Sequence, residues 1–293
     1  MENTRTKTTR NSLILLLTAA IWGMAFVSQS KGMDYMHPFT FNGVRSLIGA
    51  ASILVYILIS RKIAGDKAAP LDWKLNVKAG LLCGIFLTIA STLQQFGIKY
   101  TSVGKAGFIT TLYIIFVPMF GIFLKKKVAP VVWAAAVMAA VGMYLLCMTE
   151  SLRLGAGDIM VFLCAIAFAI QIMTVDHYAA RIDGAVVSCI QFTVCGVVCC
   201  IGALIWGQPT LGQLQEGLGA LLYAGVLSCG VGYTLQIVGQ KGLNPTVAAL
   251  IMSLESVIAT ISGWIAYKIG FLTTDQTLTA RQIAGCVIVF AAV

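Results

Sequence analysis

Long apolar runs separated by short polar segments dominate the pattern along the chain. Most runs reach the roughly 20 residues that an α-helix needs to cross a bilayer. We therefore predict an all-α membrane protein with about ten transmembrane helices, for which the lipid bilayer is the solvent. The predicted spans lie near residues 12–30, 39–60, 77–98, 103–124, 130–148, 157–178, 184–206, 217–239, 245–266 and 280–293.

The first and last runs are atypical. The first run follows Arg5, Lys7 and Arg10 and therefore resembles a signal peptide. However, no small-x-small cleavage site ends it, and other apolar runs follow. We interpret it as an uncleaved first helix. The last run has 14 residues, about 21 Å of helix, which is short of the roughly 30 Å hydrocarbon core. We expect this helix either to continue beyond Val293 or to be unusual.

Composition supports the membrane assignment. Hydrophobic residues make up 59% of the chain and charged residues only 11%, whereas about a quarter of the residues in a soluble domain are charged. The net charge of +9 comes from basic residues spread over separate loops, so it does not indicate a nucleic-acid partner.

The distribution of Lys and Arg between the loops predicts the orientation, because cytoplasmic loops carry an excess of both. With the N-terminus inside, the inside segments hold 13 such residues and the outside segments six, and the bias comes from the first half. We therefore expect a multi-pass protein of the cytoplasmic membrane with both termini inside. The inside residues are Arg5, Lys7, Arg10, Arg61, Lys62, Lys67, Lys74, Lys78, Lys125, Lys126, Lys127, Arg181 and Lys241; the outside residues are Lys31, Lys99, Lys105, Arg153, Lys268 and Arg281.

Sequence signals for metal, cofactor or catalytic chemistry are missing. All nine cysteines lie in apolar runs, and Cys195, Cys199 and Cys200, which fall within about one helical turn, have no further zinc ligands nearby. The chain has no His-Glu-x-x-His motif and no phosphate-binding loop. We predict reduced packing cysteines, no cofactor, no metal, no catalytic residue and no ATP-driven step.

The chain contains an internal repeat. A shift of 142 positions superposes residues 93–126 on 235–268 with nine identities in 34 positions. Because each copy holds five predicted helices, an odd number, the second copy must enter the membrane from the opposite side. We predict two inverted repeats, residues 12–148 and 157–293, whose exchange of conformations gives alternating access. Two fused repeats make an obligate homodimer unnecessary, so we expect a monomer.

Four short segments carry a family resemblance: Ala-Ile-Trp-Gly at 20–23, Gly-Phe-Ile-Thr-Thr-Leu-Tyr-Ile-Ile-Phe-Val-Pro at 107–118, Gly-Asp at 157–158 and Ser-Leu-Glu-Ser-Val at 253–257. In order and spacing they resemble the drug/metabolite transporter superfamily, in particular proteins of two EamA domains. The resemblance implies a ten-helix carrier of amino acids or other metabolites. The chain departs from that pattern where Ser256 replaces a proline after Glu255, so the resemblance does not imply a particular substrate.

Two charged residues, Glu255 and Arg45, lie well inside predicted spans, away from the span ends. Glu255 is about ten residues after Pro245, near the middle of the bilayer, where a carboxylate costs about 2.5 kcal/mol or more unless it faces protein or water. It is a candidate for proton coupling or for binding a cationic group, and the alternative is a structural carboxylate. Arg45 is about six residues into the second span; it is either a structural anchor or the partner of a substrate carboxylate.

Polar and aromatic residues complete the candidate site. Amides inside spans are costly when unpaired, so we expect them to point inward, and helix–helix hydrogen bonding is the alternative to a substrate role. The aromatic candidates suit a mixed cavity, although packing is the commoner role. The amides are Asn42, Gln94, Gln95, Gln171, Gln191 and Gln236, and the aromatic residues are Trp22, Tyr113 and Tyr233.

These observations together predict a secondary transporter of small organic metabolites, with amino acids foremost and protons as a candidate coupling ion. An intramembrane enzyme acting on lipid-linked substrates is one alternative, but it requires a cluster of catalytic groups and Glu255 stands alone. The other alternative is a sensor built on a transporter scaffold without transport activity.

Overall fold

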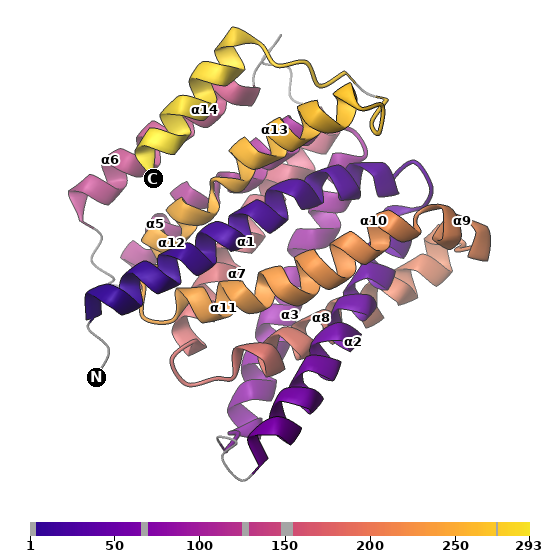
Figure 1. Cartoon of the computed structure of the whole chain (residues 1–293), viewed down its shortest axis with the longest axis vertical. Coiled ribbons are helices and arrows are strands. Elements are labelled where there is room, and N and C mark those ends of the chain that lie inside the picture. Colours follow the sequence, from indigo (N-terminus) through magenta and orange to yellow (C-terminus); the bar gives the residue numbers. More distant parts are fainter. Residues whose placement is uncertain (1–3, 66–69, 125–128, 148–154, 274) are drawn as a thin grey trace.

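The computed structural model of the chain describes residues 4–65, 70–124, 129–147, 155–273 and 275–293, and all regular structure within these ranges is helical (Figure 1). This confirms the predicted all-α class. The helices are α1 (Thr4–Gly32), α2 (Pro38–Ala64), α3 (Trp73–Ile98), α4 (Val103–Thr111), α5 (Tyr113–Phe123), α6 (Pro130–Cys147), α7 (Ala156–Tyr178), α8 (Gly184–Gly202), α9 (Leu211–Glu216), α10 (Leu218–Leu222), α11 (Tyr233–Gln240), α12 (Pro245–Met252), α13 (Glu255–Lys268) and α14 (Ala280–Ala292), with the π-helical segments η2 (Ala203–Gly207) and η3 (Tyr223–Gly232).

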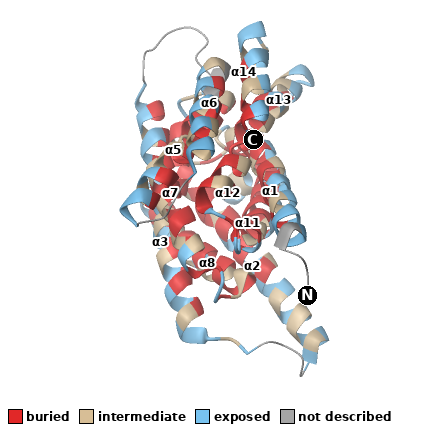
Figure 2. Ribbon diagram, turned by 90° about the vertical axis from the view of Figure 1, so that its left-hand side faces the viewer, coloured by how far each residue is buried: buried red, intermediate tan, exposed pale blue. Residues whose placement is uncertain are grey.

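The described part of the chain holds eight helical segments that are long and apolar enough to cross a membrane. Two shorter apolar helices, Pro130–Gly142 and Ala280–Ala292, lie where the fifth and tenth spans were predicted. Large apolar side chains face outward, as with Ile63 at 81% and Phe123 at 80% exposure, whereas buried residues line the interior (Figure 2). A lipid environment accounts for this distribution, so the protein is a multi-pass membrane protein.

Local sequence signals account for where several helices begin. Asp72 accepts a hydrogen bond from the backbone N–H of Leu75 and caps α3, and Asp183 accepts from two N–H groups at the start of α8. Pro38 and Pro245 occupy the first positions of α2 and α12, where a missing N–H costs nothing. Each of these helices therefore begins directly after a polar loop.

Helices from the two halves of the chain pack against one another. Helix α2 lies along α8, α3 crosses α7, and α6 pairs with α14 at one side of the bundle (Figure 1). At the α3–α7 crossing a Cβ on Gly97 would lie 2.8 Å from the carbonyl oxygen of Gly157, and a Cβ on Gly157 would lie 2.9 Å from that of Gly97. Glycine is therefore required on both helices, as is usual where membrane helices approach closely.

Two of the predicted spans are interrupted, which the sequence analysis did not predict. The run 103–124 divides into α4 and α5 at Leu112, and the run 245–266 divides into α12 and α13 at Ser253 and Leu254. Hydroxyl groups at both breaks bond to the backbone: Thr111 donates to the carbonyl of Phe108 and Ser253 to that of Leu250. Such bonds compete with the helical pattern and favour local bending. The two breaks occupy equivalent positions of the sequence repeat.

The eight cysteines whose side chains are described are free thiols, three of them at the predicted one-turn spacing on α8. The following lie outside the described residues or side chains: Arg5, Lys67, Lys125, Lys126, Lys127, Cys147 and Arg153.

Candidate functional site

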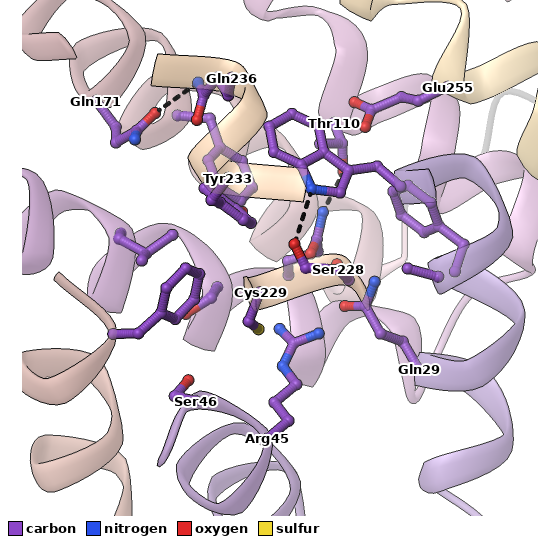
Figure 3. Close-up of a pocket in the computed structure, with 18 of the residues that line it drawn as sticks. Gln29, Arg45, Ser46, Thr110, Gln171, Ser228, Cys229, Tyr233, Gln236 and Glu255 are labelled. Atoms are coloured by element: carbon purple, nitrogen blue, oxygen red, sulfur yellow. Dashed lines mark hydrogen bonds between the residues drawn. The ribbon is translucent and has the colours of Figure 1, made fainter. Parts of the chain in front are cut away.

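A cavity of about 40 Å³ lies at the centre of the bundle (Figure 3). Residues from both halves of the chain line it, including Gln94 from α3 and Gln236 from α11, which are equivalent positions of the repeat. Asn42 and Gln191 are buried but do not line it. The sequence-predicted candidates on the cavity are Trp22, Arg45, Gln94, Tyr113, Gln171, Tyr233, Gln236 and Glu255.

The volume of the cavity limits what it holds in this conformation. A water molecule needs about 10–15 Å³ of such space, so the cavity accommodates about three waters. Pockets for organic ligands are several times larger. The space at the centre is therefore too small for a metabolite, which can enter only if the surrounding helices move apart.

The carboxylate on the cavity is held by a tyrosine from the other half of the chain. The Oη of Tyr113 donates a hydrogen bond to Oε1 of Glu255 at 3.0 Å, and both side chains are buried. Tyr113 is the first residue of α5 and Glu255 the first residue of α13, so the contact joins the two helix breaks. The first turn of a helix favours a negative charge because its N–H groups and dipole point toward it.

The cation on the cavity has no anionic partner among the described residues. Arg45 extends from α2 toward Cys229 (Figure 3), is only 5% exposed, and has its Cζ 5.3 Å from the ring centroid of Phe41. Neither of the ion pairs found in the described ranges includes Arg45, and its Nε lacks a hydrogen-bond acceptor there. A buried guanidinium without a carboxylate is costly, and an anionic group bound beside it would lower that cost.

Glutamine side chains extend the polar lining on two sides. On one side Gln236 Nε2 donates to Gln171 Oε1 at 3.2 Å, and Gln171 Nε2 donates to Gln191 Oε1 at 3.4 Å. On the other side Gln94 Nε2 donates to Thr110 Oγ1 at 3.2 Å. Gln191 thus contacts the cavity only through Gln171, and the Oε1 of Gln236 has no partner among the described residues.

Two of the amides that were predicted to point inward serve helix packing. Asn42 Nδ2 donates to the carbonyl of Ser91 at 2.8 Å and joins α2 to α3. Gln95 Nε2 donates to the carbonyl of Gln29 at 3.1 Å and joins α3 to α1. These contacts match the alternative of helix–helix hydrogen bonding.

Two of the aromatic candidates, Trp22 and Tyr233, form one side of the cavity together with Phe192. The rings of Trp22 and Tyr233 have centroids 4.5 Å apart, and the ring of Phe192 meets that of Tyr233 edge-on at 5.0 Å. Trp22 Nε1 donates to the carbonyl of Ser228, which lies in the π-helical segment η3. The three rings form an apolar side of the cavity, with their planes inclined to one another.

Several lining residues were missed by the sequence analysis, which weighed only charges, amides and aromatic residues in mid-span. Gln29 lies near the end of the first predicted span, where an amide is expected to face the membrane interface. In the structure it is 4% exposed and lines the cavity. Small hydroxyls and thiols are common in membrane helices and give no signal. The missed polar residues are Gln29, Ser46, Ser91, Thr110, Ser228 and Cys229.

Comparison with curated proteins finds transporters. An "Uncharacterized transporter" of Archaeoglobus fulgidus is 30% identical over 171 residues, covering 56% of this chain and 48% of the relative, so this alignment spans about half the length of that protein. "Uncharacterized transporter YwfM" of Bacillus subtilis is 27% identical over 256 residues, covering 86% of this chain and 84% of the relative. An "Uncharacterized transporter" of Clostridium kluyveri is 22% identical and covers 94% of this chain and 89% of the relative.

Comparison with solved structures supports the same fold. One crystal structure superposes with a TM-score of 0.73 at 16% identity, covering 97% of this chain and 95% of the other. The EamA-like transporter family matches the chain twice, over residues 10–148 and 155–293, which together include the lining of the central cavity. The chain therefore belongs to the EamA-like transporter family of the drug/metabolite transporter superfamily, with two EamA repeats.

Proposed function

We propose that the protein is a secondary transporter that moves small organic metabolites, amino acids or related compounds foremost, across the cytoplasmic membrane. The observation that carries the proposal is the central cavity: among the described residues that line it, Arg45 is the one cation and Glu255 the one carboxylate. Both are buried between the two EamA repeats, where ionisable groups in membrane proteins mark substrate or ion pathways.

The two charges suit a zwitterionic ligand. Arg45 presents a planar guanidinium that can bind a carboxylate through two parallel hydrogen bonds. Glu255 lies on a different side of the cavity in Figure 3 and can accept from an ammonium group. The aromatic wall of Trp22 and Tyr233 would contact the apolar part of the solute.

Alternating access of two inverted repeats is the proposed mechanism. In this scheme residues 12–148 and 157–293 each supply five spans, with α6 and α14 as the fifth and tenth. The breaks at Leu112 and Leu254 stand 142 positions apart and are connected by the hydrogen bond between Tyr113 and Glu255, which supports their use as matched bending points. The closed cavity is then an occluded state from which either end opens.

The proposal includes orientation, coupling and assembly. The excess of Lys and Arg on the predicted inside loops supports a cytoplasmic location for both termini.

Glu255 is the proposed proton carrier, because a buried carboxylate that hydrogen-bonds only to Tyr113 among the described residues can exchange its proton when the cavity opens. Because both repeats are present in one chain, a monomer suffices for the site.

The first experiment is a thermal-stability screen of the detergent-purified full chain against amino acids, amines, organic cations, sugars and nucleotides. A ligand at 100 times its dissociation constant stabilises by about 2.7 kcal/mol. We expect an amino acid or a related zwitterion to raise the melting temperature, and Arg45→Ala to abolish the effect. Lys62→Ala, at the exposed end of α2, is the matched control. Stabilisation only by compounds without a carboxylate would contradict the role of Arg45.

Flux in liposomes separates transport from the alternatives. A sensor on this scaffold would show ligand stabilisation without saturable uptake, whereas a transporter shows both. An intramembrane enzyme would convert its ligand, and it would need a second catalytic group. The described residues on the cavity supply no carboxylate besides Glu255 and no histidine.

A further inference from the structure

A second cavity, of about 740 Å³, lies at the end of the molecule where α1 begins, away from the central cavity. The first turns of α1, the turn between α7 and α8, and the turn after α11 surround it. Three basic residues line it, Lys7, Arg10 and Lys241, and none of its described lining residues is acidic. The fold thus gathers positive charge from segments more than 200 positions apart in the sequence.

A buried asparagine joins the two segments that carry these charges. Lys7, Arg10 and Asn11 follow one another at helical spacings of three and four, so they share one face of α1. Asn11 Nδ2 donates to the carbonyl of Lys241 at 2.7 Å, and Gly242 reverses the chain there with φ of 80°. Asn11 is 6% exposed, and its Oδ1 has no partner among the described residues.

The remaining lining is apolar. Ile182, Ile237, Val238 and Leu243 contribute to it, and Val238 is 41% exposed, so the apolar side is open to the surroundings of the bundle. Asp183, in the adjacent turn, accepts hydrogen bonds from the N–H groups of Ala185 and Val186 and neutralises the start of α8. The cavity is therefore amphipathic, with a basic part beside an apolar part.

The depth of the cavity matches the headgroup region of a bilayer. The first candidate span begins at Thr6 and the seventh ends at Gln240, which places Lys7 and Lys241 at the boundary of the apolar segments. Basic pockets between transmembrane helices at this level bind anionic lipid headgroups. A soluble anion would satisfy the charges but would leave the exposed side chain of Val238 uncovered.

We infer that this cavity binds one anionic glycerophospholipid, with the phosphate against Lys7, Arg10 and Lys241 and the first acyl methylenes against Val238 and Ile182. Such a lipid would contact both α1 and the turn after α11 and so stabilise their packing. Beyond the cavity itself, the inference requires only that the protein lies in a membrane. It needs no assumption about the transported solute.

The test is native mass spectrometry of the full chain extracted from nanodiscs of phosphatidylcholine containing increasing fractions of phosphatidylglycerol. Wild-type protein is expected to retain one phosphatidylglycerol in preference to phosphatidylcholine. Loss of each basic side chain is expected to lower the apparent affinity about fivefold, which corresponds to the contribution of one Lys or Arg near an anionic surface. The variants are Lys241→Ala and the double variant Lys7→Ala/Arg10→Ala.

Lys241→Ala keeps the backbone carbonyl that binds Asn11, so the fold is preserved and this variant carries the test if the double variant does not fold. The control is Lys74→Ala/Lys78→Ala, which removes basic residues from the exposed start of α3, outside the cavity. Equal retention of both lipids, or an equal loss in the control, would overturn the inference. It would also be overturned if inorganic phosphate alone stabilised the protein in phosphatidylcholine nanodiscs as strongly as phosphatidylglycerol does.

Discussion

The hydroxyl of Tyr113 donates a hydrogen bond of 3.0 Å to the carboxylate of Glu255, and the two residues are 142 positions apart in the chain. The same shift superposes the two halves of the sequence, so the contact joins equivalent positions of the repeat. Each residue begins the second part of an interrupted span, α5 and α13 respectively. The bond therefore connects the two helix breaks at the central cavity, and any separation of the repeats there has to break it.

Replacing Tyr113 by Phe tests how much this contact holds the closed conformation together. The variant leaves a buried carboxylate without its donor, and hydrogen bonds to charged groups contribute about 1.5–3 kcal/mol. We expect a lower apparent melting temperature in detergent. A double-mutant cycle with Glu255→Ala, which removes the acceptor, should show coupling between the two positions. Additive effects of the two substitutions would mean that the bond does not stabilise the structure.

Replacing Glu255 by Gln tests proton coupling. Glutamine has nearly the same shape and can still accept from Tyr113, but it cannot exchange a proton. We expect the variant to fold and to bind solute, and its flux in liposomes to lack the pH dependence that we expect of the wild type. Thr260→Val, one turn further along α13 and also buried, is a control outside the cavity lining. Unchanged pH-dependent flux in Glu255→Gln would exclude this residue as the coupling group.

The membrane fold could be predicted because each span is a continuous apolar run, and the eight candidate spans of the structure coincide with predicted ones. The breaks near Leu112 and Leu254 could not, because leucine is a good helix former and the deviation arises from hydroxyl bonds of Thr111 and Ser253 and from packing between the halves. Local composition does not contain that information.

The depth of the lining residues along each helix could be predicted from the sequence, but the face of each helix that lines the cavity could not. Asn42 and Arg45 are three positions apart on α2 and both are buried, yet Arg45 lines the cavity and Asn42 bonds to α3. Successive residues turn by about 100° around a helix, so the lining depends on how each helix is rotated against its neighbours. That rotation is determined by close contacts such as the one between Gly97 and Gly157.

The α3–α7 crossing predicts an effect of adding a single methyl group. In Gly97→Ala or Gly157→Ala the new Cβ meets a backbone carbonyl of the opposite helix, which cannot move aside as a side chain can. Overpacking of this kind costs roughly 1–3 kcal/mol, so we expect a lower apparent melting temperature. Gly219→Ala is the control, because a Cβ there meets no atom within 4 Å. Equal stability of all three variants would mean that the helices are not in such close contact.

A pH effect on stability is expected from His37, which lies between α1 and α2 outside the membrane spans. Burial, with a smaller contribution from the positive charge of Lys99, lowers the pKa of His37 from its usual 6.5. Its neutral Nδ1 accepts a hydrogen bond from the backbone N–H of Phe39 and caps α2, a bond that the protonated ring cannot make. The rings of Phe39 and Phe96 contact the imidazole.

Because the pKa is lower in the folded protein than in the unfolded chain, the unfolded chain binds more protons below pH 6.5. The stability associated with neutral His37 is therefore complete above that pH and is lost as the pH falls through the folded pKa. His37→Asn preserves a helix-capping acceptor but does not titrate. We expect the apparent melting temperature of the wild type to fall more steeply between about pH 7 and pH 5 than that of His37→Asn, with the two proteins alike above pH 7. Parallel curves over the whole range would show that protonation of His37 has no part in the acid sensitivity of the protein.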